Sequence, residues 1–219
     1  MEPREIRENA IREAKCNLIM DAARAIFADK GFHEARLEDI AASAGFSKAS
    51  LYNYYPDKEA IFLSLAIREY DRVIQAITTA VRNDQTLDRN LRAVLATVFT
   101  HFGEHFAFIL TTSSLQNRAA LHAQMCRHEQ LMEQMFKGME QVLSTLGEMI
   151  RIARERGEVD SALSDRQIAG FIGALIRGAL FEWKIQGRIG DVEETIQTTV
   201  SFVSSGIGVK TGTGNAVVR

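Results

Sequence analysis

The fold is decided by the stretch Leu37-Glu-Asp-Ile-Ala-Ala-Ser-Ala-Gly-Phe-Ser-Lys-Ala-Ser-Leu-Tyr-Asn-Tyr-Tyr55. Two short helical patterns, one before Gly45 and one opening at Ser47, are joined by a tight turn, as in a helix-turn-helix. Gly45 supplies the positive φ that the turn needs, and Ser47 is a good N-cap for the second helix. Ile40 and Leu51 are expected in the core where the two helices meet. The stretch therefore predicts a small helical domain built around this motif.

The second helix of the motif leaves a polar face exposed. Its cap directs free backbone N–H groups outward, where a phosphate can sit. The outer face combines a charge, a small side chain, an aromatic ring and an amide, from Lys48, Ala49, Tyr52 and Asn53. An amide reads adenine with two hydrogen bonds, and a lysine reads guanine or holds phosphate. The pattern indicates a DNA-reading helix; a solvated helical hairpin with no DNA role is the alternative.

Long helices are expected on both sides of the motif. The 219 residues contain only two prolines, Pro3 and Pro56, and an interior proline costs a helix roughly 3 kcal/mol. Apolar residues recur at helical spacing over 11–30, and Gly31 ends that pattern as a C′ glycine. Asp57 is a good N-cap for a helix running to about residue 82. Further helices are predicted over 87–103, 106–117, 120–156, 164–187 and 191–206.

On these residues the chain resembles the TetR (tetracycline-repressor-like) family of transcriptional regulators. The resemblance covers about residues 11–65 and rests on five short matches: Gly31-Phe32, Leu37-Glu-Asp-Ile-Ala41, Ala44-Gly-Phe-Ser47, Leu51-Tyr52 and Tyr55-Pro-Asp-Lys-Glu59. It implies an all-α protein, in which an N-terminal three-helix bundle with a helix-turn-helix precedes a larger helical ligand-binding and dimerisation domain. The domains expected are 1–56 for DNA binding, with an arm over 1–10, then 57–207 for effector binding and dimerisation, then a disordered tail over 208–219.

The resemblance also implies which side chains touch DNA. Lys48, Ala49, Tyr52, Asn53 and Tyr54 match the recognition-helix positions, and Lys58 matches a phosphate-binding lysine. Together with the helix-capping serine and a neighbouring cation, the DNA-binding set is Arg36, Ser47, Lys48, Ala49, Tyr52, Asn53, Tyr54 and Lys58. Arg36 stands where the family often has threonine, Ala49 where glycine is frequent, and Tyr55 where phenylalanine is commoner.

The charge balance of the N-terminal part is unusual for this role. Residues 1–70 hold 10 Lys and Arg against 12 Asp and Glu, whereas a DNA-binding domain is usually basic. Local clustering of Arg36, Lys48 and Lys58, with help from Arg4, Arg7, Arg12 and Lys15, reconciles the two. Few phosphate contacts then predict modest non-specific binding and a shallow dependence on salt.

A dimer interface is expected in residues 167–183. Small residues recur every four positions at Gly170, Ala174 and Gly178, and a helix-interior glycine costs up to about 1 kcal/mol, which a close helix contact offsets. These three residues and Phe181 are the predicted interface, within a four-helix bundle across a two-fold axis. Close packing within one chain is the alternative.

The middle of the chain is the expected ligand site. Five of the seven methionines lie between 125 and 149, and methionine forms pliable apolar walls. The candidate pocket residues are Phe102, His105, Phe106, Thr112, Gln116, His122, Met125, Met132 and Trp183. They suit a mostly apolar molecule with a few hydrogen-bonding groups. A Met- and Phe-rich core without ligand is the alternative, and no metal or cofactor is expected, because His101 and His105 have no identifiable third ligand.

Other classes of protein are disfavoured by the sequence. The longest charge-free run, 195–209, has 15 residues, and a bilayer span needs about 20, so no membrane association is expected. Cys16 and Cys126 fit neither a disulfide framework nor a metal site, which favours the cytoplasm. No catalytic apparatus is visible, so an enzyme is not expected. The function predicted is a homodimeric repressor, released from palindromic double-stranded operator DNA by a small-molecule effector; a helical ligand-binding or adaptor protein that has lost DNA binding is the alternative.

Overall fold

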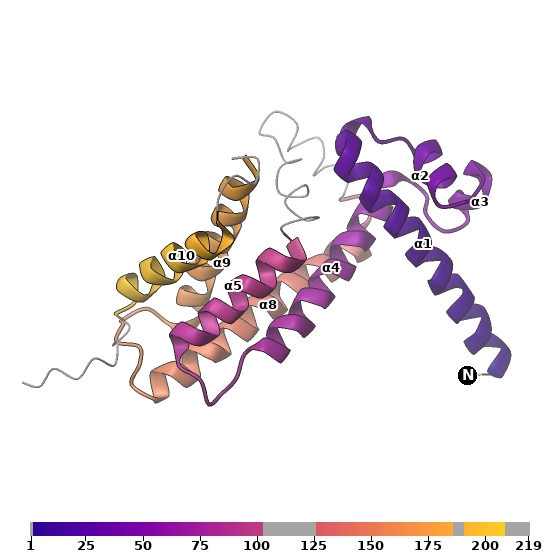
Figure 1. Cartoon of the computed structure of the whole chain (residues 1–219). Helices are drawn as coiled ribbons and strands as arrows, with labels where there is room; N and C mark the ends of the chain where they lie inside the picture. Colours follow the sequence, from indigo (N-terminus) through magenta and orange to yellow (C-terminus); the bar gives the residue numbers. More distant parts are fainter. Residues whose placement is uncertain (1, 103–125, 186–190, 209–219) are drawn as a thin grey trace, which may run out of the picture. The chain divides into compact units, whose positions relative to one another are not determined.

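The computed structural model describes residues 2–102, 126–185 and 191–208, and these residues form eight helices (Figure 1). The helices are α1 (Pro3–Glu34), α2 (Leu37–Ser43), α3 (Lys48–Tyr52), α4 (Lys58–Ala80), α5 (Leu87–Phe102), α8 (Glu129–Glu155), α9 (Asp165–Ile185) and α10 (Val192–Gly206). The all-α fold class is therefore confirmed. The helix expected over 106–117 and the tail over 209–219 lie outside the described residues.

The described chain divides into two compact units. The first holds residues 2–71 and 126–138, and the second holds 72–102, 139–185 and 191–208. Helices α4 and α8 each run from one unit into the other. The first half of α4 thus belongs to the same compact unit as α1, α2 and α3. The division into a DNA-binding domain ending at residue 56 and an effector-binding domain beginning at residue 57 remains a prediction.

An aromatic cluster holds the first unit together. The ring centroids of Phe27 and Phe32, both in α1, lie 5.4 Å apart. The ring of Phe62 in α4 lies 6.0 Å from that of Phe27 and 5.0 Å from that of Phe32, between centroids. Ile40 of α2 and Leu51 of α3 are each fully buried against this core, as the motif predicts. Burying a large apolar side chain stabilises a fold by about 1.5–3 kcal/mol, so this core fixes how α2 and α3 sit on α1.

Helix α1 begins much earlier than its apolar pattern suggests. The sequence predicts a helix from residue 11 and an arm over 1–10, but the helix begins at Pro3. Proline fits the first helical position because its φ is already helical and its missing N–H has no partner there. The backbone N–H of Glu2 bonds Glu5 at 3.1 Å. Local capping therefore forms the helix here without any buried face, and hydrophobic periodicity does not report it.

Helix α8 begins later than predicted. The sequence places a helix over 120–156, whereas Cys126 and Arg127 form a turn and the helix begins at Glu129. Just before it, Nε2 of His128 lies 2.9 Å from a carboxylate oxygen of Asp57. The same carboxylate caps α4, because it accepts the N–H of Ala60 at 2.8 Å. The turn thus places a histidine on the cap of α4, which a continuous helix would not do.

The second unit is a packed set of helices. Helix α10 lies against both α5 and α9. Side chains hold the segment between α4 and α5 through hydrogen bonds. The side chain of Asn90 bonds both the backbone N–H and the C=O of Arg82, and the carboxylate of Glu158 accepts the N–H of Leu87 at 2.6 Å. No helix in the described ranges is long and apolar enough to cross a membrane.

Candidate DNA-binding interface and neighbouring sites

The turn between α2 and α3 has the geometry that the sequence predicts. Gly45 adopts a φ of 75°, a left-handed conformation that favours glycine. The side chain of Ser47 accepts the N–H of Ser50 at 3.1 Å and so caps α3. Phe46 packs partly buried against the core. The short α3 is therefore held at its start by the cap and on its inner side by Leu51.

The outer face of α3 is open to solvent. Ser47, Lys48, Ala49, Tyr52 and Asn53 are all exposed, and the ring of Tyr52 keeps 47% of its surface. These five residues therefore occupy the positions that a recognition helix requires, and their contact with DNA remains a prediction.

The remaining predicted DNA contacts lie in other surroundings. Arg36 is exposed and has no ion-pair partner among the described residues. Tyr54 is half-buried, with its ring edge-on to Phe46 at 5.7 Å between centroids. The ring of Tyr54 is thus part of the packing behind α3 rather than of its open face.

Lys58 has its ammonium group occupied inside the protein. Its Nζ donates to the carbonyl oxygens of Phe32, His33 and Ala35, at 2.9, 2.9 and 3.2 Å. The same nitrogen lies 4.8 Å from the centre of the Phe32 ring. A cation at a helix C-terminus meets carbonyls that no helical N–H can satisfy. Lys58 therefore joins the end of α1 to the start of α4, where the sequence suggests a phosphate contact.

Lys48 is paired with a carboxylate of α2. Its Nζ donates to Glu38, and both side chains remain about half exposed. The Lys48 ammonium holds the pKa of Glu38 below its ordinary value, and the Glu38 carboxylate in turn raises the pKa of Lys48. Since the pair is exposed, it is weak and opens readily. A phosphate approaching α3 would compete with Glu38 for this lysine.

Replacing Glu38 by glutamine is expected to strengthen DNA binding. The change frees Lys48 and removes a negative charge that repels phosphates, so affinity should rise roughly threefold to tenfold at low salt. Fluorescence anisotropy with labelled duplex DNA at several salt concentrations measures it. Asp39→Asn is the matched control, because Asp39 pairs with Lys30 at 2.8 Å and should matter less. A loss of affinity in Glu38→Gln would mean that Glu38 positions Lys48 for its contact.

Two cations that the motif does not include lie beside Tyr54. The guanidinium carbon of Arg12 is 5.5 Å from the ring centre of Tyr54, and Nζ of Lys15 is 5.9 Å from it. Both come from the part of α1 that precedes the core. The sequence names both among four N-terminal cations that could help DNA binding, and their spacing of three places them on one helical face.

The predicted dimer residues lie on an open face of α9. Gly170 is half-buried, and Ala174, Gly178 and Phe181 are exposed. A Cβ built on Gly170 or Gly178 meets no atom within 4 Å. No described residue of the same chain therefore packs against these two glycines, and the dimer interface remains a prediction.

Large apolar side chains surround this face. Phe171 of α9 and Phe202 of α10 keep 58% and 66% of their surface exposed. A mainly apolar groove of about 440 Å³ runs between the two helices, lined by Leu163, Ile168, Phe171, Ile172, Ala174, Leu175, Phe202, Val203, Gly206 and Ile207. An apolar face of this kind is typical of an interface between subunits.

Most of the predicted ligand-pocket residues fall outside the description. Six of them lie outside the described ranges: His105, Phe106, Thr112, Gln116, His122 and Met125. For Phe102 only the backbone is described. Met132 is buried in the core of the first unit. Trp183 lies in the second unit, edge-on to Phe99 at 5.6 Å. The predicted pocket therefore stays a prediction.

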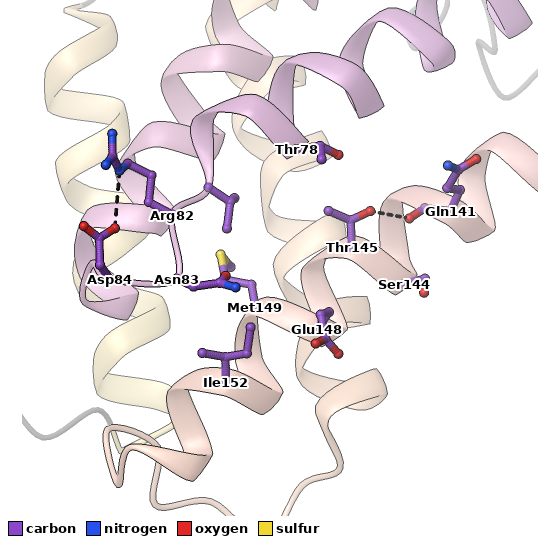
Figure 2. A pocket seen from close by; sticks show the side chains of 11 residues that line it. Thr78, Arg82, Asn83, Asp84, Gln141, Ser144, Thr145, Glu148, Met149 and Ile152 are labelled. Atoms are coloured by element: carbon purple, nitrogen blue, oxygen red, sulfur yellow. Dashed lines mark hydrogen bonds and ion pairs between the residues drawn. The ribbon is translucent and has the colours of Figure 1, made fainter.

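A separate open groove of about 730 Å³ lies in the second unit (Figure 2). Its walls come from the end of α4, the following loop and α8, and none of its residues belongs to the predicted pocket: Thr78, Val81, Arg82, Asn83, Asp84, Gln141, Ser144, Thr145, Glu148, Met149 and Ile152. The charged side chains that line this groove form ion pairs within the chain: Arg82 pairs with Asp84, and Glu148 pairs with Arg151. Among the described residues no cluster of side chains fits a metal ion.

Comparison with known proteins bears on the first unit most directly. Residues 19–65 match the model of the bacterial regulatory proteins of the tetR family. An HTH-type transcriptional activator, FasR of Mycolicibacterium smegmatis, is 31% identical over 94 residues, which are 43% of this chain and 42% of that protein. The chain thus spans less than half of this relative.

Two further likenesses extend over nearly the whole chain. The fatty acid metabolism regulator protein of Bacillus subtilis is 24% identical over 191 residues, 86% of this chain and 93% of that protein. The crystal structure of the regulator FadR from Bacillus subtilis in complex with stearoyl-CoA superposes with a TM-score of 0.71 at 20% identity, covering 87% of this chain and 98% of that one. The matched motif therefore shows that residues 19–65 belong to the tetR family of bacterial regulatory proteins, and the chain as a whole has the helical fold of such regulators.

Proposed function

We propose that this chain is a DNA-binding repressor that acts in the cytoplasm as a homodimer and leaves a palindromic operator when a small molecule binds. The observation that carries the proposal is the exposed outer face of α3, which presents Lys48, Tyr52 and Asn53 to solvent from a helix fixed by its cap and core. A second copy is required because one recognition helix reads too few base pairs to be selective. The open apolar face of α9 and α10 supplies the surface for that copy.

The effector we propose is a fatty acyl-CoA thioester. Support comes from the relatives: one is named a fatty acid metabolism regulator, and a FadR structure of similar fold holds stearoyl-CoA. The sequence independently favours a mostly apolar molecule, because methionine and phenylalanine gather in the middle of the chain. An acyl chain with a polar carrier meets that description.

Release from DNA is proposed to occur through α4. This helix begins shortly after the helix-turn-helix and contributes residues to both units, which supports a role in passing on the effect of a ligand. Two recognition helices of a dimer must lie about 34–36 Å apart to enter successive major grooves. A ligand that favours another tilt of α4 shifts the population away from that spacing.

Loss of the recognition side chains tests DNA binding. The full chain selects its binding site from a random duplex pool, and anisotropy then gives affinities for that site. Tyr52→Ala and Asn53→Ala are expected to weaken binding at least tenfold, because one good base contact contributes about 1–3 kcal/mol of discrimination. Gln197→Ala on α10 is the control and should bind as the unmodified chain does. Unchanged affinity in both recognition variants would refute the assignment.

Titration with acyl-CoA tests the effector. Stearoyl-CoA, added below its micelle-forming concentration to the preformed complex, is expected to release the labelled site. Free coenzyme A and stearate are the controls and should release much less. Release by coenzyme A alone, or by none of the three, would contradict an acyl-CoA effector and leave the DNA-binding result standing.

A ligand-binding or adaptor role without DNA is the second candidate. Its support is the net negative charge of residues 1–70 and the pairing of Lys48 with Glu38. It requires that no sequence be enriched from the random pool while stearoyl-CoA still raises the melting temperature of the chain. Enrichment of one sequence excludes this role.

A further inference from the structure

Most cations of the first unit are already occupied by partners in the chain. The occupied ones and their partners are Arg4 with Glu8, Arg24 with Asp21, Lys30 with Asp39, Lys48 with Glu38, Lys58 with backbone carbonyls and Arg68 with Asp21. Arg12 and Lys15, like Arg7 and Arg36, are exposed and have no carboxylate partner among the described residues. Their charge is thus available to something outside the chain.

The ring of Tyr54 holds both cations in one place. Arg12 and Lys15 lie 5.5 and 5.9 Å from its centre, within the range of a cation–π interaction. The ring itself is fixed, because Phe46 lies edge-on to it and the backbone N–H of Tyr54 bonds Leu51 at 2.9 Å. Tyr54 lies two residues after the end of α3 and so sets the two cations next to the recognition helix.

The helical geometry of α1 explains why these cations face α3. Residues 12, 15, 16 and 19 share one side of an α-helix. Ile19 on that side is fully buried in the core, and Cys16 packs partly buried against it. One turn further toward the N-terminus the same side carries Lys15 and then Arg12. Figure 1 shows α1 continuing past α2 and α3 in this direction. The inner face of α1 therefore changes from apolar to basic where the core ends.

We infer that Arg12 and Lys15 bind the DNA phosphate backbone at the edge of the major groove that α3 enters, and that Tyr54 positions them. This inference rests on the proposed DNA-binding function. The major groove is about 12 Å wide and bordered by phosphates, so cations held 5.5 and 5.9 Å from the ring centre of Tyr54, two residues beyond α3, reach one border. Because a helix carries both side chains, they meet phosphates without the ordering cost that a flexible arm has.

Tyr54 acts through the two cations in this arrangement. The resemblance places Tyr54 among direct DNA contacts, but the residue is half-buried and its ring contacts Phe46 and the two cations. A direct contact requires the phenolic hydroxyl, whereas the cation–π platform requires only the ring. Phenylalanine and leucine at this position therefore separate the two roles.

The first experiment measures how binding to the selected operator depends on salt. Each phosphate contact contributes about 0.9 to the slope of log K against log salt, so Arg12→Gln with Lys15→Gln should lower the slope by about 1.8 per protomer. Affinity for unrelated duplex DNA should fall by the same factor, since phosphates carry no sequence information. Arg89→Gln on α5 removes one exposed positive charge from the second unit and should leave the slope unchanged.

The second experiment compares Tyr54→Phe with Tyr54→Leu. The phenylalanine variant should keep the full slope, and the leucine variant should lose most of what the double glutamine variant loses. In the glutamine background, leucine should add little, because the residues act as one unit. A far-ultraviolet circular dichroism melt checks each fold.

The outcomes separate the inference from the function beneath it. An unchanged slope in the double glutamine variant, with operator binding intact, overturns the phosphate contacts. An equal loss in Tyr54→Phe and Tyr54→Leu overturns the positioning role. If the leucine variant does not fold, the phenylalanine and glutamine variants still decide both points. Failure of the unmodified chain to select any operator refutes the proposed function instead.

Discussion

Lys58→Met is expected to lower the stability of the N-terminal unit by about 3 kcal/mol. The lysine donates to three carbonyl oxygens at the end of α1, and hydrogen bonds from a charged donor contribute about 1.5–3 kcal/mol each, not additively. Methionine keeps the aliphatic length but leaves the carbonyls without their donor. The melting temperature, followed by circular dichroism, should fall by roughly 6–12 °C.

Lys30→Met is the matched control for this change. Lys30 is an exposed lysine of the same unit, paired only with Asp39 at 2.8 Å, and an exposed ion pair contributes little. Its melting temperature should stay within about 2 °C of the unmodified chain. If Lys58→Met instead melts normally and binds DNA less tightly, the lysine is a phosphate contact and the cap is incidental.

Gly178→Leu is expected to split the dimer and abolish operator binding. In the single chain a Cβ at Gly178 meets no atom within 4 Å, so the helix accepts leucine and gains about 0.8 kcal/mol in helix propensity. A partner helix packed on the glycine cannot accept it. Light scattering should give the chain mass of 24.4 kDa instead of twice that value, and affinity for the selected site should fall at least a hundredfold.

Gly147→Leu provides the comparison. Gly147 is also a helical glycine whose added Cβ meets nothing within 4 Å, and it lies on α8 and is not one of the predicted interface residues. This variant should remain dimeric and bind DNA. A Gly178→Leu protein that stays dimeric would show that the subunits meet on another face.

Sequence reasoning predicted the local geometry of the motif well. Gly45 needed a positive φ, Ser47 a cap and Leu51 a buried site, and all three were found because each depends on near neighbours in the chain. Asp57 likewise caps its helix as expected. The residues that determine a turn or a helix cap lie within about four positions of one another in the sequence.

Partners distant in sequence were not predictable in the same way. The three carbonyls that bind Lys58 lie 23 to 26 residues before it, and only the folded core brings them there. The early start of α1 was missed for another reason. Hydrophobic periodicity reports buried faces, and the first turns of α1 have none. The features that indicate this helix start are Pro3 at the first helical position and the capping contact between Glu2 and Glu5.

The internal pairing of most cations in the first unit has a consequence for the behaviour of the regulator in a cell. A chromosome offers about a million or more competing sites, and the share of molecules held there depends on the same phosphate contacts that hold the operator. A domain with few available cations dissociates quickly from these non-specific sites, and only a small share of its molecules is bound there at any time. Few copies per cell then suffice to occupy one operator, and a molecule expelled by its effector does not settle on the DNA beside it.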